Sequence, residues 1–267
     1  MIELPAPGFG SIRALLTGGM VGHSLIAALL EGNHTGRVFV DAAPAARTPS
    51  TALVALTCEF NYVLGRADNP EANAAIRSLL WSGLDPEAEY VVVFPTSEAW
   101  QGVLEAMFGG ASELHHGARD EYTFDVDRWT AAHGDWRSRI PAGFEVRPYD
   151  HALAEGQGFA EFWGSLDAFL ERGIGYAVVK DGEAVSRCHT VMVGAGEAEI
   201  SIETAEPYRR RGMATLAACA FIERCQEVGL HPAWSNWDYN EPSRRLAERL
   251  GFVRRGTSPA LIARVKA

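Results

Sequence analysis

Three consecutive arginines and a glycine, Arg209 to Gly212, constrain the fold of this chain more than any other feature. They stand between a β-like stretch at 199–204 and a stretch of helical periodicity from Met213 to Gly229. A helix that begins here presents unpaired backbone N–H groups and a positive dipole end, which suit phosphate groups. Gly212 removes a Cβ where a phosphate would approach the backbone. The pattern predicts a phosphate-binding loop; a solvated arginine run on a surface helix is the alternative.

Length and charge limit the class of protein. The 267 residues suffice for two domains of similar size, and 47% hydrophobic with 22% charged residues excludes wholesale disorder. The net charge of −10 repels phosphate backbones, so nucleic acids and anionic membrane surfaces are not expected partners. The N-terminus lacks a basic-then-apolar leader pattern, and no apolar run approaches about 20 residues. These observations predict a cytoplasmic protein.

The four cysteines show neither a CxxC pair nor a zinc-like spacing with histidine. They are expected to be reduced, two of them on the apolar face of the helix that follows Gly212. No metal site is predicted.

Hydrophobic periodicity and turn residues predict an α/β (α+β) fold with a mixed central sheet flanked by helices. Predicted strands lie at 37–41, 52–57, 61–64, 90–94, 121–126, 144–147, 175–180, 184–193, 199–204, 232–236, 252–254 and 261–265. Predicted helices lie at 24–31, 70–81, 98–108, 151–157, 161–171, 213–228 and 240–250. Both halves follow one plan of three strands, helix, strand, helix, strand. A polar segment at 127–142 predicts a linker, which gives domains at 1–135 and 136–267.

Two motifs resemble the GCN5-related N-acetyltransferase (GNAT) superfamily. Arg209, Gly212 and Ala214 fill the positions of its Arg/Gln-x-x-Gly-x-Gly/Ala loop, and Asn240 begins a last helix that is followed by Gly251-Phe252. The likeness continues over nearly the whole chain, with weaker N-terminal motifs, toward a two-domain group that includes zwittermicin A resistance-type acetyltransferases. No second Arg-x-x-Gly-x-Ala loop precedes residue 140. The resemblance therefore implies a catalytic C-terminal GNAT domain after a degenerate GNAT-like N-terminal domain.

The resemblance also implies an acetyl-CoA site. Pantetheine would lie along the strand at 202–204 and the pyrophosphate on the amides at 210–215. The expected donor-binding residues are Ile202, Thr204, Arg209, Arg210, Arg211, Gly212, Met213, Ala214, Thr215, Asn240 and Ser243.

The sequence determines the catalytic residues less fully than the donor-binding residues. The superfamily often carries a tyrosine, which can protonate the leaving thiolate, where this sequence has Ala247; Tyr239, Ser243 or a bound water could replace it. Strand alternation places Glu199 and Glu203 on one face. Glu203 is the first candidate for the base, Glu199 acting through water is the second, and both could instead line an acidic acceptor pocket.

These features predict an N-acetyltransferase in which a primary amine of a small molecule attacks acetyl-CoA directly. The negative charge favours a cationic acceptor. The alternative function is a catalytically silent sensor that binds acyl-CoA without turnover. The oligomeric state is left open, with a homodimer as one option.

Overall fold

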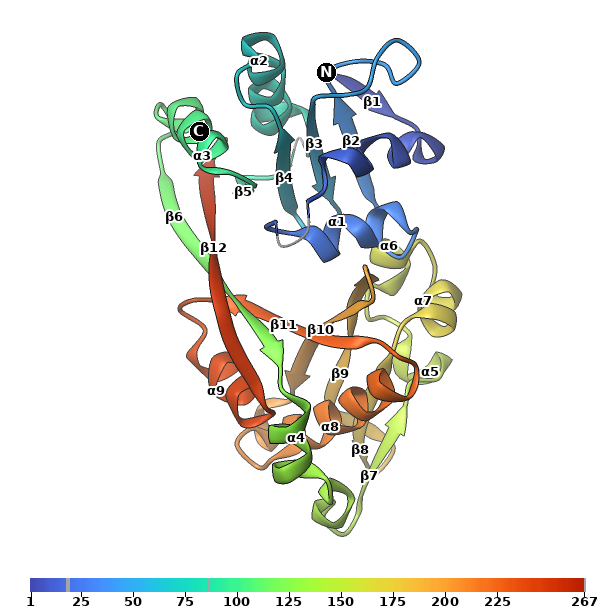
Figure 1. Cartoon of the computed structure of the whole chain (residues 1–267). Coiled ribbons are helices and arrows are strands. Elements are labelled where there is room, and N and C mark those ends of the chain that lie inside the picture. The colour runs from blue at the N-terminus through green and yellow to red at the C-terminus, as the bar shows by residue number, and fades with distance from the viewer. Residues whose placement is uncertain (18–19, 86, 267) are drawn as a thin grey trace. The chain divides into compact units, whose positions relative to one another are not determined.

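The computed structural model describes residues 1–17, 20–85 and 87–266, which form two compact units (Figure 1). Unit 1 contains Met1–Glu31, Thr35–Arg119 and the C-terminal residues from Ser258. Unit 2 contains Gly32–His34 and Asp120–Thr257. A hydrophobic core lies within each unit.

Unit 1 has the strand order β1–β2–β3–β4–β5–β12–β6. Strands β4 and β5 pair in parallel, whereas β1–β2, β2–β3, β3–β4 and β5–β12 pair antiparallel. Its strands are β1 (Ile2–Leu4), β2 (Gly36–Val40), β3 (Thr51–Leu56), β4 (Phe60–Gly65), β5 (Tyr90–Pro95), the N-terminal part of β6 (Leu114–Phe124) and the C-terminal part of β12 (Phe252–Arg264). Its helices are α1 (His23–Leu30), α2 (Pro70–Ser78) and α3 (Glu98–Phe108), with a 3₁₀ helix at Ala6–Leu15 and a π turn at Leu79–Gly83.

Helix α3 illustrates how this unit is built. The side chain of Ser97 caps the helix by accepting a hydrogen bond from the backbone N–H of Trp100. Trp100, Leu104 and Phe108 then recur at helical spacing, and all three are buried in the core of unit 1. The predicted helix at 98–108 is confirmed.

Unit 2 has the strand order β12–β6–β11–β10–β9–β8–β7. Its strands are the N-terminal part of β12, the C-terminal part of β6 (Leu114–Phe124), β7 (Phe144–Pro148), β8 (Gly175–Lys180), β9 (Glu183–Gly194), β10 (Glu197–Thr204) and β11 (His231–Trp237). Its helices are α4 (Val126–His133), α5 (His151–Ala154), α6 (Phe159–Trp163), α7 (Leu166–Arg172), α8 (Met213–Glu227) and α9 (Glu241–Arg249). The predicted plan of three strands, helix, strand, helix, strand is confirmed as β2-β3-β4-α2-β5-α3-β6 and β8-β9-β10-α8-β11-α9-β12.

Neighbouring residues of β9 show how the sheet of unit 2 is covered on both faces. Cys188 is fully buried in the core, next to Cys219 and Cys225 of α8. The next residue, His189, points to the opposite face because side chains alternate along a strand. There its ring lies 4.9 Å from that of Phe159 on α6. Helix α8 thus covers one face, and α6 and α7 cover the other.

The parallel pair β10 and β11 diverges early. Their register runs only from Glu197↔His231 to Glu199↔Ala233. Residues 200–204 of β10 continue beyond the last pair, still bonded to β9 on the other side. This divergence leaves one edge of β10 unpaired directly before the loop that leads to α8.

The predicted linker at 127–142 is wrong. This segment contains α4 and a 3₁₀ turn at Trp136–Arg139. The side chain of Asp125 caps α4, while Trp129 and Trp136 are buried in the core of unit 2. Two large apolar side chains anchor a segment whose average composition is polar.

The last two predicted strands, 252–254 and 261–265, form one continuous strand, β12. The units also depart from the predicted boundary between residues 135 and 136, because residues 120–135 belong to unit 2 and those from Ser258 to unit 1. Strands β6 and β12 each contribute residues to both units. A degenerate N-terminal domain and a catalytic C-terminal domain stay predictions.

Candidate functional site

The loop between β10 and α8 ends in a helix start without a side-chain cap. Gly212 is the N-cap of α8, with φ of 84°, a left-handed conformation that favours glycine. The first α-helical hydrogen bond runs from Leu216 N–H to Gly212 C=O, at 3.1 Å. The N–H groups of Met213, Ala214 and Thr215 therefore lack an acceptor within the helix. A Cβ built on Gly212 would meet nothing within 4 Å, so the space beside this helix start is open.

The loop arginines differ in what they contact. Arg209 Nε donates a 3.0 Å hydrogen bond to the carbonyl of Thr204, which ties the loop to the end of β10. Arg210 has a φ of 61°, an uncommon conformation for a residue other than glycine. Arg211 lies 5.8 Å from the ring centroid of Tyr208. The loop is held by its own contacts in a shape that exposes the start of α8.

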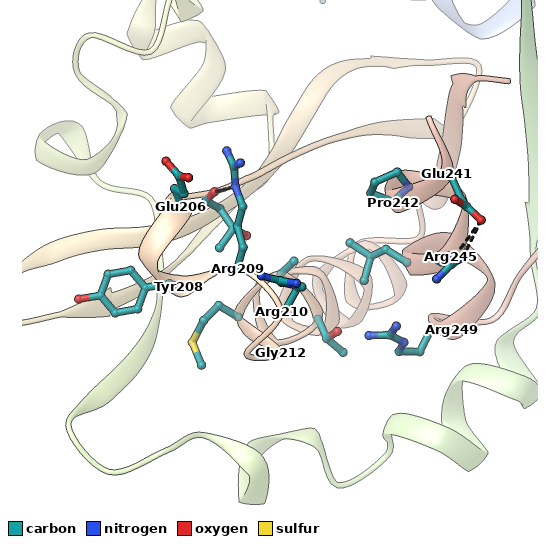
Figure 2. A pocket seen from close by; sticks show the side chains of 14 residues that line it. Glu206, Tyr208, Arg209, Arg210, Gly212, Glu241, Pro242, Arg245 and Arg249 are labelled. Atoms are coloured by element: carbon teal, nitrogen blue, oxygen red, sulfur yellow. Dashed lines mark hydrogen bonds and ion pairs between the residues drawn. The ribbon is translucent and has the colours of Figure 1, made fainter. Parts of the chain in front are cut away.

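A pocket of about 780 Å³ opens over this helix start (Figure 2). It is lined by Thr204, Glu206, Tyr208, Arg209, Arg210, Gly212, Met213, Ala214, Thr215, Glu241, Pro242, Arg245, Leu246 and Arg249. Four of these residues are arginines and two are glutamates, so the pocket is cationic in a chain of net charge −10. The helix dipole of α8 adds further positive potential.

The start of α9 forms one wall of this pocket. The side chain of Asn240 caps α9 by accepting a 3.3 Å hydrogen bond from the backbone N–H of Ser243. The hydroxyl oxygen of Ser243 accepts a 3.1 Å hydrogen bond from Trp234 Nε1 on β11. The side chains of Asn240 and Ser243 thus have structural roles at the helix start.

Two carboxylates lie on the face of β10 opposite α8. Glu199 is buried and accepts a 2.5 Å hydrogen bond from Ser235 Oγ on β11. Glu203 is exposed and lies opposite Arg187 of β9 in the strand register. Burial, followed by the charge of Arg187, lowers the pKa of His189, on the same face, to about 4.

The structure brings together part of the predicted site. Seven of the predicted donor-binding residues line the pocket: Thr204, Arg209, Arg210, Gly212, Met213, Ala214 and Thr215. Its lining does not include Ile202, Glu203, Arg211, Tyr239, Asn240 and Ser243. Tyr239 is 75% exposed and stacks on Trp237 with ring centroids 6.1 Å apart.

Sequence reasoning expected Asn240 and Ser243 of α9 at the donor site and missed the charged residues of α9 that line this pocket. Glu241, Arg245 and Arg249 recur every fourth residue, so they share one face of the helix. This four-residue spacing could have indicated a charged face of the helix from the sequence alone. The spacing does not tell which side of α9 faces the loop.

Within the described ranges, no helix is both long and apolar enough to span a membrane. Among the same residues, no group of three or more His, Cys, Asp or Glu side chains could hold a metal ion.

A meander followed by a diverging parallel strand pair and a basic helix start is the architecture of the GNAT class of acyltransferases. The sequence model of the GNAT acetyltransferase family matches residues 16–261, and the chain belongs to this family. It is a two-domain member.

Known proteins resemble this chain to different extents. The protein described as uncharacterized N-acetyltransferase YdfB of Bacillus subtilis (strain 168) is 29% identical over 166 residues, or 60% of this chain. The chain thus spans about three fifths (61%) of the length of this relative.

Two solved structures share the fold over almost their full length. A GCN5-related N-acetyltransferase-like protein of Streptococcus suis has a TM-score of 0.71 at 21% identity, covering 97% of this chain and 99% of its own. A tandem GNAT protein from the clavulanic acid biosynthesis pathway has a TM-score of 0.66 at 14% identity, covering 100% and 98%.

Proposed function

We propose that the protein transfers an acetyl group from acetyl-CoA to a primary amine of a small molecule. The observation that carries this proposal is the cationic pocket over the start of α8, where Gly212 leaves open space beside unpaired N–H groups. A pyrophosphate fits such a pocket because it can accept hydrogen bonds from the N–H groups and pair with arginines. CoA combines a pyrophosphate with the thioester arm that the family uses.

The pocket and the adjoining end of β10 would hold different parts of the donor. The N–H groups of Met213, Ala214 and Thr215 would bind the pyrophosphate, with Arg209 and Arg210 supplying charge. The edge of β10 at 202–204 has diverged from β11 and offers main-chain groups to the amides of pantetheine, although the carbonyl of Thr204 already accepts from Arg209. Acetyl-CoA supplies the activated acetyl group as a thioester.

Glu203 is the residue we propose as the base. An attacking amine must be neutral, so its extra proton has to be accepted by a nearby group. The exposed carboxylate of Glu203 lies in the part of β10 that has diverged from β11. Glu199, buried and hydrogen-bonded to Ser235, is the second candidate and would act through water. Protonation of the leaving thiolate is assigned to Ser243, Tyr239 or a bound water.

The acceptor is proposed to be a cationic small molecule. The net charge of −10 attracts cations from solution, and Glu199 and Glu203 share one face of β10. These carboxylates would orient the amine, and one of them would take its proton.

A substitution at the helix start tests the donor site. Gly212→Glu places a carboxylate in the space assigned to the pyrophosphate, so calorimetry should detect no acetyl-CoA binding. Gly229→Glu is the matched control: Gly229 follows α8 at its other end, also has positive φ (72°), and a Cβ there meets nothing within 4 Å. Undiminished affinity in folded Gly212→Glu protein contradicts the assignment.

A catalytically silent sensor is the second candidate function. Ala247, at the position where the family often carries a tyrosine, has a methyl side chain with no dissociable proton, so it cannot supply an acid. Release of CoA from acetyl-CoA in the presence of a library of small amines separates the two functions. Release with at least one amine supports the transferase, whereas tight binding without release supports the sensor.

A further inference from the structure

Two arginines of α9 line the pocket from the side opposite the loop. Arg245 and Arg249 are one helical turn apart, and both project from α9 toward the pocket (Figure 2). Arg209 and Arg210 approach the same space from the loop between β10 and α8. The pocket therefore has two separate groups of guanidinium side chains.

The two arginines of α9 differ in their partners. Arg245 pairs with Glu241, with Nη2 2.7 Å from Oε1. Within the described part of the chain, no carboxylate lies within ion-pair distance of the Arg249 guanidinium. Guanidinium groups that share a pocket repel one another unless an anion lies between them. Arg249 is thus the arginine best placed to bind an anion.

Arg249 is the last residue of α9, and its backbone is held by a hydrogen bond to another element. Nε2 of the buried His133 donates a 2.8 Å hydrogen bond to the carbonyl oxygen of Arg249. Arg139 donates to Nδ1 of the same imidazole at 3.2 Å, which leaves the hydrogen on Nε2. These bonds hold the backbone of the last turn of α9 in place. Less conformational entropy of this backbone is therefore lost when Arg249 binds an anion.

We propose that Arg249, with Arg245 beside it, binds the phosphate group on the ribose of CoA. The inference rests on the proposed function, which assigns the pyrophosphate to the loop and the start of α8. CoA carries a second anionic group on its ribose, and the arginines of α9 form the second cationic group of the same pocket. The protein then selects free CoA thioesters over donors that lack this phosphate, such as 3′-dephospho-CoA or an acyl group on a carrier protein's phosphopantetheine.

Calorimetry with CoA and with 3′-dephospho-CoA tests this assignment. Wild-type protein should bind CoA about tenfold more tightly, because one charge-assisted contact depends on the ribose phosphate. Arg249→Gln should lose this preference by weakening CoA alone, and Arg249→Lys should keep part of it. Arg244→Gln is the matched control, since Arg244 precedes Arg245 on α9 and does not line the pocket. Circular dichroism verifies the fold of each variant.

Three results would overturn the assignment. Equal loss of both ligands in Arg249→Gln indicates a general electrostatic effect. If wild-type protein binds both ligands equally, it makes no contact with the ribose phosphate; the proposed CoA site is then retained and only this inference fails. Wild-type protein that binds neither ligand contradicts the proposed function and this inference with it.

Discussion

Ser235 on β11 donates a 2.5 Å hydrogen bond to Oε1 of Glu199 on β10. Glu199 belongs to the last residue pair that joins these two strands, and Ser235 lies two residues beyond its partner Ala233. The side chains bridge β10 and β11 where the backbone register ends. Glu199 is buried in this arrangement, while Glu203, farther along the diverging strand, is exposed. Two carboxylates on one strand face thus have different environments, which supports different roles for them.

Exchange of each carboxylate for its amide tests these roles. Glu203→Gln should lower kcat by about 100-fold, most severely below the pKa of the amine, because no base then accepts its proton. The affinity for acetyl-CoA should change little. Glu199→Gln is the matched comparison, since its amide oxygen can still accept from Ser235 and the strand contact survives.

Steady-state kinetics over a pH series separate the outcomes. A raised KM with unchanged kcat in Glu203→Gln would show that Glu203 only attracts the acceptor. A loss of kcat confined to Glu199→Gln would transfer the assignment of the base to Glu199.

Ser243 is predicted to contribute to stability as well as to the site. Its hydroxyl oxygen accepts from Nε1 of Trp234, a side chain only 3% exposed. Ser243→Ala leaves this buried donor unpaired, so the free energy of unfolding should fall by about 1–3 kcal/mol in urea denaturation. Ser243→Thr keeps the hydroxyl and should retain most of the stability. If Ser243 also protonates the thiolate, the alanine variant loses kcat under conditions where it is fully folded; unchanged kcat leaves Tyr239 or a bound water as the acid.

The sequence identifies elements that local chemistry determines. Gly212 is predicted at the helix start from phosphate chemistry, and it adopts the positive φ that favours glycine. The segment at 127–142 is mispredicted because Trp129 and Trp136 bury themselves against residues distant in sequence. The role of Arg249 is missed for a similar reason, since it depends on how α9 packs beside the start of α8. Tertiary contacts decide both, and local patterns do not encode them.

One acetyl-CoA site per chain is expected. In unit 1 the helix that corresponds to α8 is α2, and its N-cap Asn69 already accepts from the N–H of Ala72. Pro70 removes another N–H from this helix start, and Arg66 preceding it pairs with Asp68 at 2.9 Å. The start of α2 therefore lacks what suits a pyrophosphate at Gly212, because its side-chain cap accepts from a backbone N–H and the neighbouring arginine is already paired. Calorimetry should give a stoichiometry of one, and a value of two would contradict a degenerate N-terminal domain.

His189 should make folding stability depend on pH. Burial among Phe159, Phe169 and Tyr149, followed by the positive charge of Arg187, lowers its pKa from 6.5 to about 4. The unfolded chain therefore binds a proton at this residue between these two values while the folded chain does not. The stabilisation is fully present above pH 6.5 and is lost as the pH falls toward 4, so the free energy of unfolding decreases by about 3 kcal/mol from this group.

Substitution of the imidazole isolates this contribution from that of the carboxylates. His189→Phe keeps an aromatic ring in the apolar site and removes the titration, so its free energy of unfolding should fall less steeply than that of wild type between pH 7 and pH 4. His231→Gln is the matched control, because His231 at the start of β11 is exposed, and it should follow the wild-type curve. Urea denaturation at several pH values measures all three proteins. Parallel curves for wild type and His189→Phe would mean that His189 titrates alike in the folded and unfolded chain.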